Sequence, residues 1–222
     1  MFVSLLVSFG VTAAFAQGPP GPGGKPGGGR VSPKWQSSVG QGVTSARSSG
    51  GPMLVSVGRS GSQPPAMDVD ASGPRGASPE VQAMKRMTFV HMDASDADVE
   101  TARNMAGGGG AEGASETARA LSKYDVDELP AAFLTDRYGN LLQRVSPDEL
   151  TPEGILAVVS AATRAASDRD REVTSCLEQA LAALAAGTVP DKECLERLLK
   201  YEGYEEVTSK AREILEQLGG SR

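Results

Sequence analysis

Two cysteines and a single histidine are the residues of this 222-residue chain best suited to covalent chemistry. Cys176 and Cys194 both fall on apolar stripes of expected helices, so a structural disulfide, two buried free thiols and a reactive pair all remain open. In a straight helical hairpin that turns near Thr188, the two would be offset by about 9 Å, beyond bridging range unless the loop shifts. The reactive pair is least favoured, because only Lys192 and Arg197 lie nearby to lower a thiol pKa.

Serine chemistry would need a base beside the hydroxyl. Ser60 and Ser62 are the candidate serines, and His91 is the only histidine that could serve either of them. His91 alternates with apolar neighbours in an expected strand, where a packing role is the simpler interpretation. We therefore expect no catalytic residue of this kind.

An acidic cluster, Asp93, Asp96 and Asp98, opens a segment that we interpret as a solvated loop over residues 94–113. It lacks the central glycine and closing glutamate of a calcium-binding EF-hand. Gly107–Gly110 follows without the Lys-Ser/Thr pair of a phosphate loop, and is interpreted as a flexible insertion. No metal and no cofactor is expected.

The elements around these residues alternate between helix and strand. Trp35, Val39, Val43 and Ala46 recur at helical spacing and predict a first helix that ends at Gly50-Gly51. Ser78-Pro79 is typical of a helix start, and Tyr138-Gly139-Asn140 is typical of a hairpin turn. The further predicted elements are strands at Met53–Val57, Phe89–Asp93, Ala131–Thr135 and Leu141–Val145, and helices at Pro79–Met87, Ser115–Lys123 and from Thr151. The fold class is α/β, with a mixed sheet.

Residues 35–165 resemble the thioredoxin-like superfamily. The resemblance rests on the Trp35 helix, the strand Met53–Val57, and the run Tyr124 to Leu129-Pro130 before a hairpin. It implies a sheet of four or five strands flanked by helices, with Pro130 cis beside the reactive site. In such domains this proline faces a Cys-x-x-Cys pair and positions the backbone of bound peptides.

The thiols that the resemblance calls for are absent. Gly61-Ser62-Gln63-Pro64 falls where Cys-x-x-Cys would lie, and a serine hydroxyl neither ionises as a thiol does nor forms a disulfide. The resemblance therefore implies a degenerate binding site at Gly61–Pro64 and Leu129-Pro130, with a protein or peptide as partner. For Pro130, a purely architectural turn is the favoured interpretation.

The N-terminal region predicts export. Residues 1–16 are uncharged and apolar and close on Ala14-Phe15-Ala16, typical of a signal peptide cut before Gln17, although no basic residue precedes the run. The run is too short to span a membrane comfortably, so no integral segment is expected after its removal. Residues 17–34 are rich in glycine and proline and are interpreted as a disordered linker. The net charge of −6 disfavours nucleic acid as a partner.

Beyond residue 168 the composition changes to helix formers. Residues 170–219 predict three amphipathic helices, interrupted at Gly187 and preceding Gly219-Gly220. Three functions remain open: an exported, redox-inactive thioredoxin-like binding or scaffold module; a divergent oxidoreductase that uses Cys176 and Cys194; and a helical adaptor in which the α/β domain is only a platform.

Overall fold

The computed structural model describes residues 29–70 and 78–219. The predicted signal peptide, residues 1–16, lies outside the described residues, as does most of the predicted linker. The strands are β1 (Arg30–Val31), β2 (Trp35–Gln36), β3 (Met53–Arg59), β4 (Val69–Asp70), β5 (Thr88–Ala94), β6 (Ala131–Thr135) and β7 (Leu141–Val145). The helices are α1 (Val39–Ser49), α2 (Pro79–Met84), α3 (Asp96–Ala106), α4 (Glu116–Lys123), α5 (Ile155–Ala185), α6 (Lys192–Leu198) and α7 (Glu205–Gly219), with a short 3-10 turn at Pro147–Glu149.

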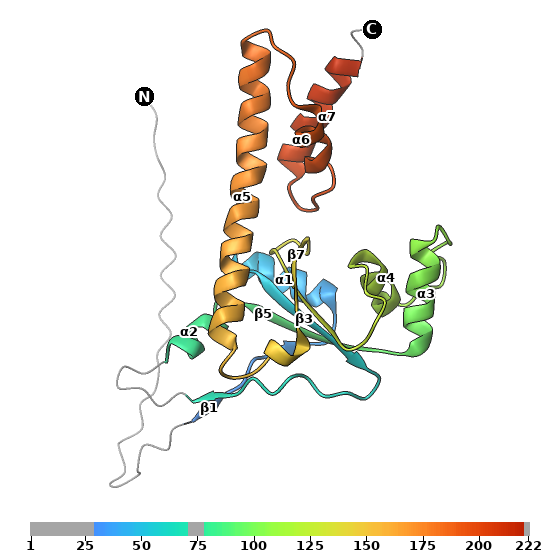
Figure 1. The fold of residues 1–222 in the computed structure, drawn as a ribbon, viewed down its shortest axis with the longest axis vertical. Helices are drawn as coiled ribbons and strands as arrows, with labels where there is room; N and C mark the ends of the chain where they lie inside the picture. Colours follow the sequence, from blue (N-terminus) through green and yellow to red (C-terminus); the bar gives the residue numbers. More distant parts are fainter. Residues whose placement is uncertain (1–28, 71–77, 220–222) are drawn as a thin grey trace, which may run out of the picture.

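Five strands form one mixed sheet in the order β2-β5-β3-β6-β7 (Figure 1). β2, β5 and β3 run parallel, β6 is antiparallel to β3, and β7 is antiparallel to β6. The parallel pair β3 and β5 requires a crossover, which α2 supplies, whereas β6 and β7 are joined by a tight turn. The predicted α/β class with a mixed sheet is confirmed.

The sheet has an apolar core on each face, because successive strand residues point in opposite directions. Leu54 packs with α2 and the first half of α5, while Val55 and Val57 pack with α3 and α4. Figure 1 shows α2 beside the lower half of α5, with α3 and α4 away from both. Burial on both faces matches the nearly continuous apolar run in β3.

Two local predictions are wrong. Trp35 belongs to edge strand β2, where it pairs with Phe89, and the helix begins only at Val39 behind the Ser38 cap. Within residues 94–113, predicted as a loop, α3 forms because Ser95 and Asp98 make a reciprocal capping box at its start.

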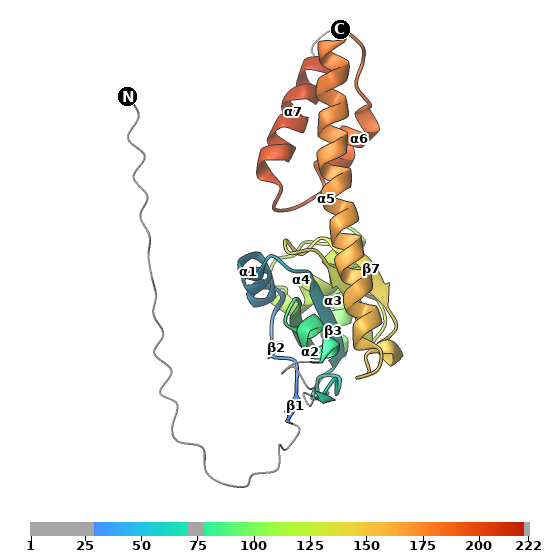
Figure 2. The ribbon, with the colours of Figure 1, turned by 90° about the vertical axis from the view of Figure 1, so that its left-hand side faces the viewer.

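A single long helix joins the sheet to the C-terminal region. α5 runs without interruption from Ile155 to Ala185, so the predicted boundary between residues 165 and 170 falls inside a helix. Its first half covers the sheet, and its second half packs with α6 and α7 around Leu195, Leu198 and Ile214 (Figure 2). The predicted helical extension is therefore present, and it shares its first helix with the α/β domain.

The linker prediction for residues 17–34 needs correction at its described end. Arg30–Val31 forms β1 and pairs antiparallel with Val69–Asp70, so this stretch has regular structure. Among the described residues, no helix combines the length and apolar content needed to cross a bilayer.

Candidate functional site

The two segments predicted to form the site leave the sheet at the same end. Val57 of β3 lies opposite Ala131 of β6, and Gly58 lies opposite Asp93 of β5. Gly61–Pro64 therefore follows β3 at the edge where Leu129-Pro130 enters β6. The Leu129-Pro130 peptide bond is cis.

Gly61–Pro64 and Leu129-Pro130 nevertheless turn toward opposite faces of the sheet. Ser62 contacts polar residues of β5, whereas Leu129 packs against the core beneath α3 and α4. The predicted residues do not converge on one cluster. They belong instead to two neighbouring sites, a polar cluster at Ser62 and a groove at Leu129.

The polar cluster joins a serine, a histidine and a carboxylate. Ser62 Oγ lies 3.4 Å from His91 Nε2 and donates to Asp93 Oδ1 at 3.3 Å. His91 Nε2 lies 3.4 Å from the same Asp93 oxygen, and Gly61 N donates to Asp93 Oδ2 at 3.4 Å. The His91 side chain is only 9% exposed. The cluster fixes the turn that follows β3.

The arrangement differs from that of a serine hydrolase. In a catalytic triad the carboxylate holds the imidazole nitrogen that faces away from the serine. Here Asp93 and Ser62 share Nε2, and the hydroxyl of Ser56 lies 3.4 Å from Nδ1. Trp35 packs edge-on against the histidine ring. His91 thus has both a packing role and a polar one, and only the first was predicted.

Gly58 makes room for this cluster. A Cβ at Gly58 would overlap the Ser62 hydroxyl and would lie 3.2 Å from His91 Cε1. The glycine at the end of β3 was the sequence signal for a close approach, and it was not used.

A groove of about 480 Å³ lies on the other side of the strand end. It is lined by Arg59, by residues of α3 from Asp96 to Arg103, and by residues 127–129. Its two arginines are engaged: Arg59 pairs with Asp96 at 3.3 Å, and Arg103 donates to the Asp127 carbonyl at 2.7 Å.

Three further carboxylates in the groove, on Glu100, Asp127 and Glu128, make no hydrogen bond or ion pair with any described residue. The groove therefore carries excess negative charge beside the cis peptide. Arg103 and Glu100 were not singled out from the sequence, because α3 was predicted to be a loop; nor was Arg59, at the end of β3.

The acidic residues predicted as a solvated loop have separate roles. Asp96 is exposed in the first turn of α3, where its charge suits the helix dipole. Asp98 accepts from both Ser95 and Ser115, and these hydrogen bonds, that from Ser115 foremost, lower the pKa of its carboxyl. Within the described residues, no group of three His, Cys, Asp or Glu could hold a metal ion.

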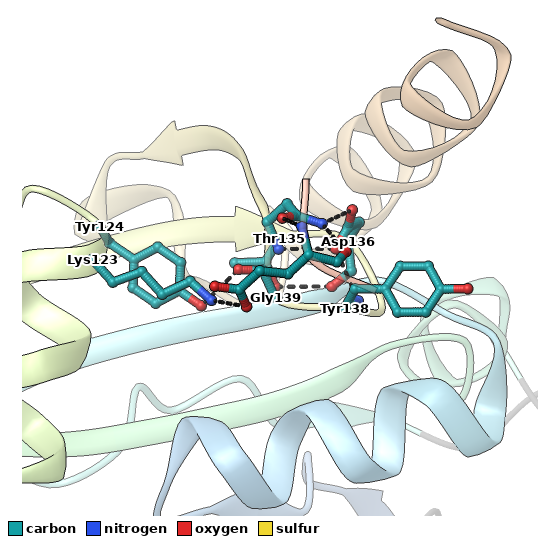
Figure 3. A network of polar contacts seen from close by, with 8 residues as sticks. Lys123, Tyr124, Thr135, Asp136, Tyr138 and Gly139 are labelled. Atoms are coloured by element: carbon teal, nitrogen blue, oxygen red, sulfur yellow. Dashed lines mark hydrogen bonds and ion pairs between the residues drawn. The ribbon is translucent and has the colours of Figure 1, made fainter. Parts of the chain in front are cut away.

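The helical extension is attached at the opposite end of the sheet. Thr135 pairs with Met53 at the start of β3, so the β6–β7 turn lies far from Ser62. Asn140 in that turn donates to the Glu202 carbonyl at 2.9 Å and accepts from Glu202 N at 2.8 Å. Figure 3 shows the two residues at the end of α4 beside this attachment: Tyr124 donates to Gly139 of the turn, and Lys123 donates to the Glu202 carboxylate at 2.6 Å.

Two tyrosine hydroxyls, on buried Tyr124 and half-buried Tyr204, hold the turn and the helix that meet at this attachment. Tyr124 donates to the Gly139 carbonyl at 2.9 Å, and burial raises its pKa. Tyr204 donates to Asp170 at 2.7 Å and stacks edge-on against Tyr138, and burial followed by the Asp170 hydrogen bond raises its pKa. Both groups remain neutral donors over the physiological range.

Cys176 and Cys194 form a disulfide that joins α5 to α6 within the extension. Cys176 is 4% exposed and belongs to the extension's apolar core. The pair therefore lies beyond the docked end of the sheet, whereas Gly61–Pro64 and Leu129-Pro130 lie at the other end.

Comparison with known proteins gives no relative: no family model, curated protein or solved structure matches the chain. The geometry of the candidate site offers a polar turn at Ser62 without an activated nucleophile. Beside it lies a negatively charged groove that could bind a positively charged segment.

Proposed function

We propose that the chain is a thioredoxin-like protein without thiol chemistry, which binds a protein or peptide segment in the groove beside Leu129 and Pro130. A five-stranded mixed sheet with helices on both faces, and a cis Leu129-Pro130 bond before the hairpin, support the resemblance. Binding at such a loop depends on backbone and groove contacts, so it does not require sulfur.

One observation carries the proposal. The turn after β3 presents the Ser62 hydroxyl, held by His91 and Asp93, while both cysteines are bonded to each other in the extension. Thiol exchange needs an accessible thiolate or a disulfide that a thiolate can reach. Neither sulfur lies at the sheet end where a peptide would contact Pro130.

The charge of the groove indicates the kind of segment that it would bind. Unpaired carboxylates on Glu100, Asp127 and Glu128 favour a basic peptide, and Leu129 offers an apolar contact. Charge-assisted hydrogen bonds to these exposed carboxylates would fix its orientation.

A titration tests this binding. A fluorescein-labelled peptide of lysine and valine is added to residues 17–222, and fluorescence anisotropy is recorded. We expect saturable binding that weakens about tenfold in Glu100→Lys and in Asp127→Lys. Glu112→Lys, an exposed charge change on the loop after α3, is the matched control. Absence of binding, or equal binding by all variants, would rule out the groove.

Export is part of the proposal. The predicted signal peptide and a disulfide that persists in an oxidising compartment both support an extracytoplasmic location. Periplasmic or secreted fractions of cells expressing the full chain should contain the form that begins at Gln17. Recovery of the uncut chain from the cytoplasm alone would contradict this.

The helical adaptor remains a second candidate, because the extension exposes apolar side chains. Leu181 is 46% exposed, Leu199 is 38% exposed and Val189 is 82% exposed. If these residues recognise the partner protein, the double variant Leu181→Glu with Leu199→Glu would abolish its binding. The groove variants Glu100→Lys and Asp127→Lys would then leave that binding unchanged. The oxidoreductase alternative is disfavoured by the burial of Cys176.

A further inference from the structure

A second groove, of about 570 Å³, lies between α2 and the first half of α5. It is on the sheet face opposite α3 and α4, so it is separate from the groove at Leu129 (Figure 1 shows the two pairs of helices apart). Its lining includes three arginines, Arg86, Arg164 and Arg171, and no carboxylate. In a chain with a net charge of −6, this concentration of positive charge is local.

Two of the arginines are available to a ligand. The guanidinium groups of Arg86 and Arg164 make no hydrogen bond or ion pair with any described residue. Arg171 is held at the rim, where it donates to Asp168 at 3.1 Å and to Ser167 at 3.3 Å. Both side chains are exposed, so packing does not restrain them. Their guanidinium N–H groups are therefore available to hydrogen-bond a partner in the groove.

The remaining lining adds hydroxyl donors above an apolar floor. Ser160, Thr163 and Ser167 are exposed along one face of α5, at helical spacing with Arg164. Between them and α2, the floor is formed by Val159, which is 5% exposed, and by Leu156 and Ala83. Such a surface matches a segment that alternates carboxylates with an apolar side chain.

We infer that this groove docks an acidic segment of a partner protein, with partner carboxylates on Arg86 and Arg164 and an apolar partner side chain on the Val159 floor. Arginine binds carboxylates through two parallel N–H donors, which gives both affinity and orientation. The inference stands independently of the proposed function, since it uses a different face and the opposite charge. Together the two grooves would let one molecule hold a basic and an acidic segment at once.

The test uses a fluorescein-labelled peptide of glutamate and leucine, titrated into residues 17–222 and followed by anisotropy. We expect saturable binding that weakens as salt is raised. Binding should weaken at least about tenfold in Arg86→Glu and in Arg164→Glu. Arg212→Glu, on the exposed side of α7, is the matched control and should bind as the unmodified chain does.

Further variants distinguish binding in this groove from misfolding, from attraction to the overall charge and from a small-anion site. Arg86 and Arg164 are exposed, so circular dichroism should show unchanged folding, and Arg164→Gln should weaken binding without reversing charge. The Glu100→Lys variant should bind the acidic peptide normally. Equal binding by Arg86→Glu and Arg212→Glu would overturn the inference. Saturable binding of inorganic phosphate without binding of the peptide would also overturn it, in favour of a small-anion site.

Discussion

Ser62 Oγ lies 3.4 Å from His91 Nε2, and the two residues meet because Gly58, next to them on the sheet, has no side chain. The contact joins the turn after β3 to the neighbouring strand β5. It places a hydroxyl and an imidazole where the thioredoxin-like resemblance implies reactive sulfur. The site's architecture therefore depends on a glycine.

Gly58→Ala should displace Ser62 from His91. The added Cβ would overlap the Ser62 hydroxyl, so the turn must move or the strand must shift. Overpacking of this kind costs about 1–3 kcal/mol. Urea denaturation should show that loss in the free energy of unfolding, and the His91 ring resonances should shift. Gly110→Ala, which adds a methyl group in open space, should change neither quantity.

Loss of the disulfide should loosen the extension and leave the sheet intact. The bond closes a loop with a sequence separation of 18, for which its removal costs about 3 kcal/mol. In Cys176→Ser with Cys194→Ser, hydrogen exchange should accelerate in α6 and α7, while β3 and β5 keep their protection. Equal loss of protection in β3 would show that extension and sheet unfold as one unit.

Asn140→Ala should detach the extension from the β6–β7 turn. The change leaves the Glu202 N–H and carbonyl without their partners, at a cost of about 1–3 kcal/mol. Small-angle scattering should report an increased radius of gyration. Asn104→Ala, an exposed change on α3, serves as the control, and an unchanged radius in Asn140→Ala would assign the attachment to Tyr204 and Lys123 instead.

Asp98 should give the fold a dependence on acid. Its pKa is lowered in the folded state, so its contribution is present above the ordinary value of 3.8 and is lost as pH falls through the lowered value. Asp98→Asn should cost about 1 kcal/mol near neutral pH, as loss of a cap does. It should also flatten the stability profile below pH 3.8 relative to Asp148→Asn, an exposed control. Parallel profiles of unfolding free energy against pH for the two variants would mean that titration of Asp98 does not affect stability.

The strands were predictable because their signals are local. Ala131–Thr135 and Leu141–Val145 have the predicted bounds, since a turn with glycine separates the two strands and a proline lies just outside each outer end. Trp35 was misassigned because β2 has only two residues, too few to show alternation. α3 was missed because its apolar face is small, while its decisive signal was the cap formed by Ser95 and Asp98.

The site was less predictable because its contacts join strands distant in sequence. Ser62 and His91 become neighbours only through the parallel pairing of β3 and β5. The disulfide, one of the alternatives that the sequence left open, forms because the loop makes up the offset between the two helices. From Cys176 to the end of α5 at Ala185 the helix rises roughly 14 Å. An extended residue spans about 3.3 Å, so the short loop before Asp191 covers that distance and brings the Cα atoms of Cys176 and Cys194 to 6.0 Å.

The central claim is that no sulfur acts at the end of the sheet where Ser62 and Pro130 lie. The most direct test is the reduction of insulin by dithiothreitol in the presence of residues 17–222. The turbidity of the solution reports the precipitation of reduced insulin. We predict an onset of precipitation equal to that of the buffer blank, with and without the Cys176→Ser change. A marked acceleration by the unmodified chain that Cys176→Ser abolishes would contradict this claim.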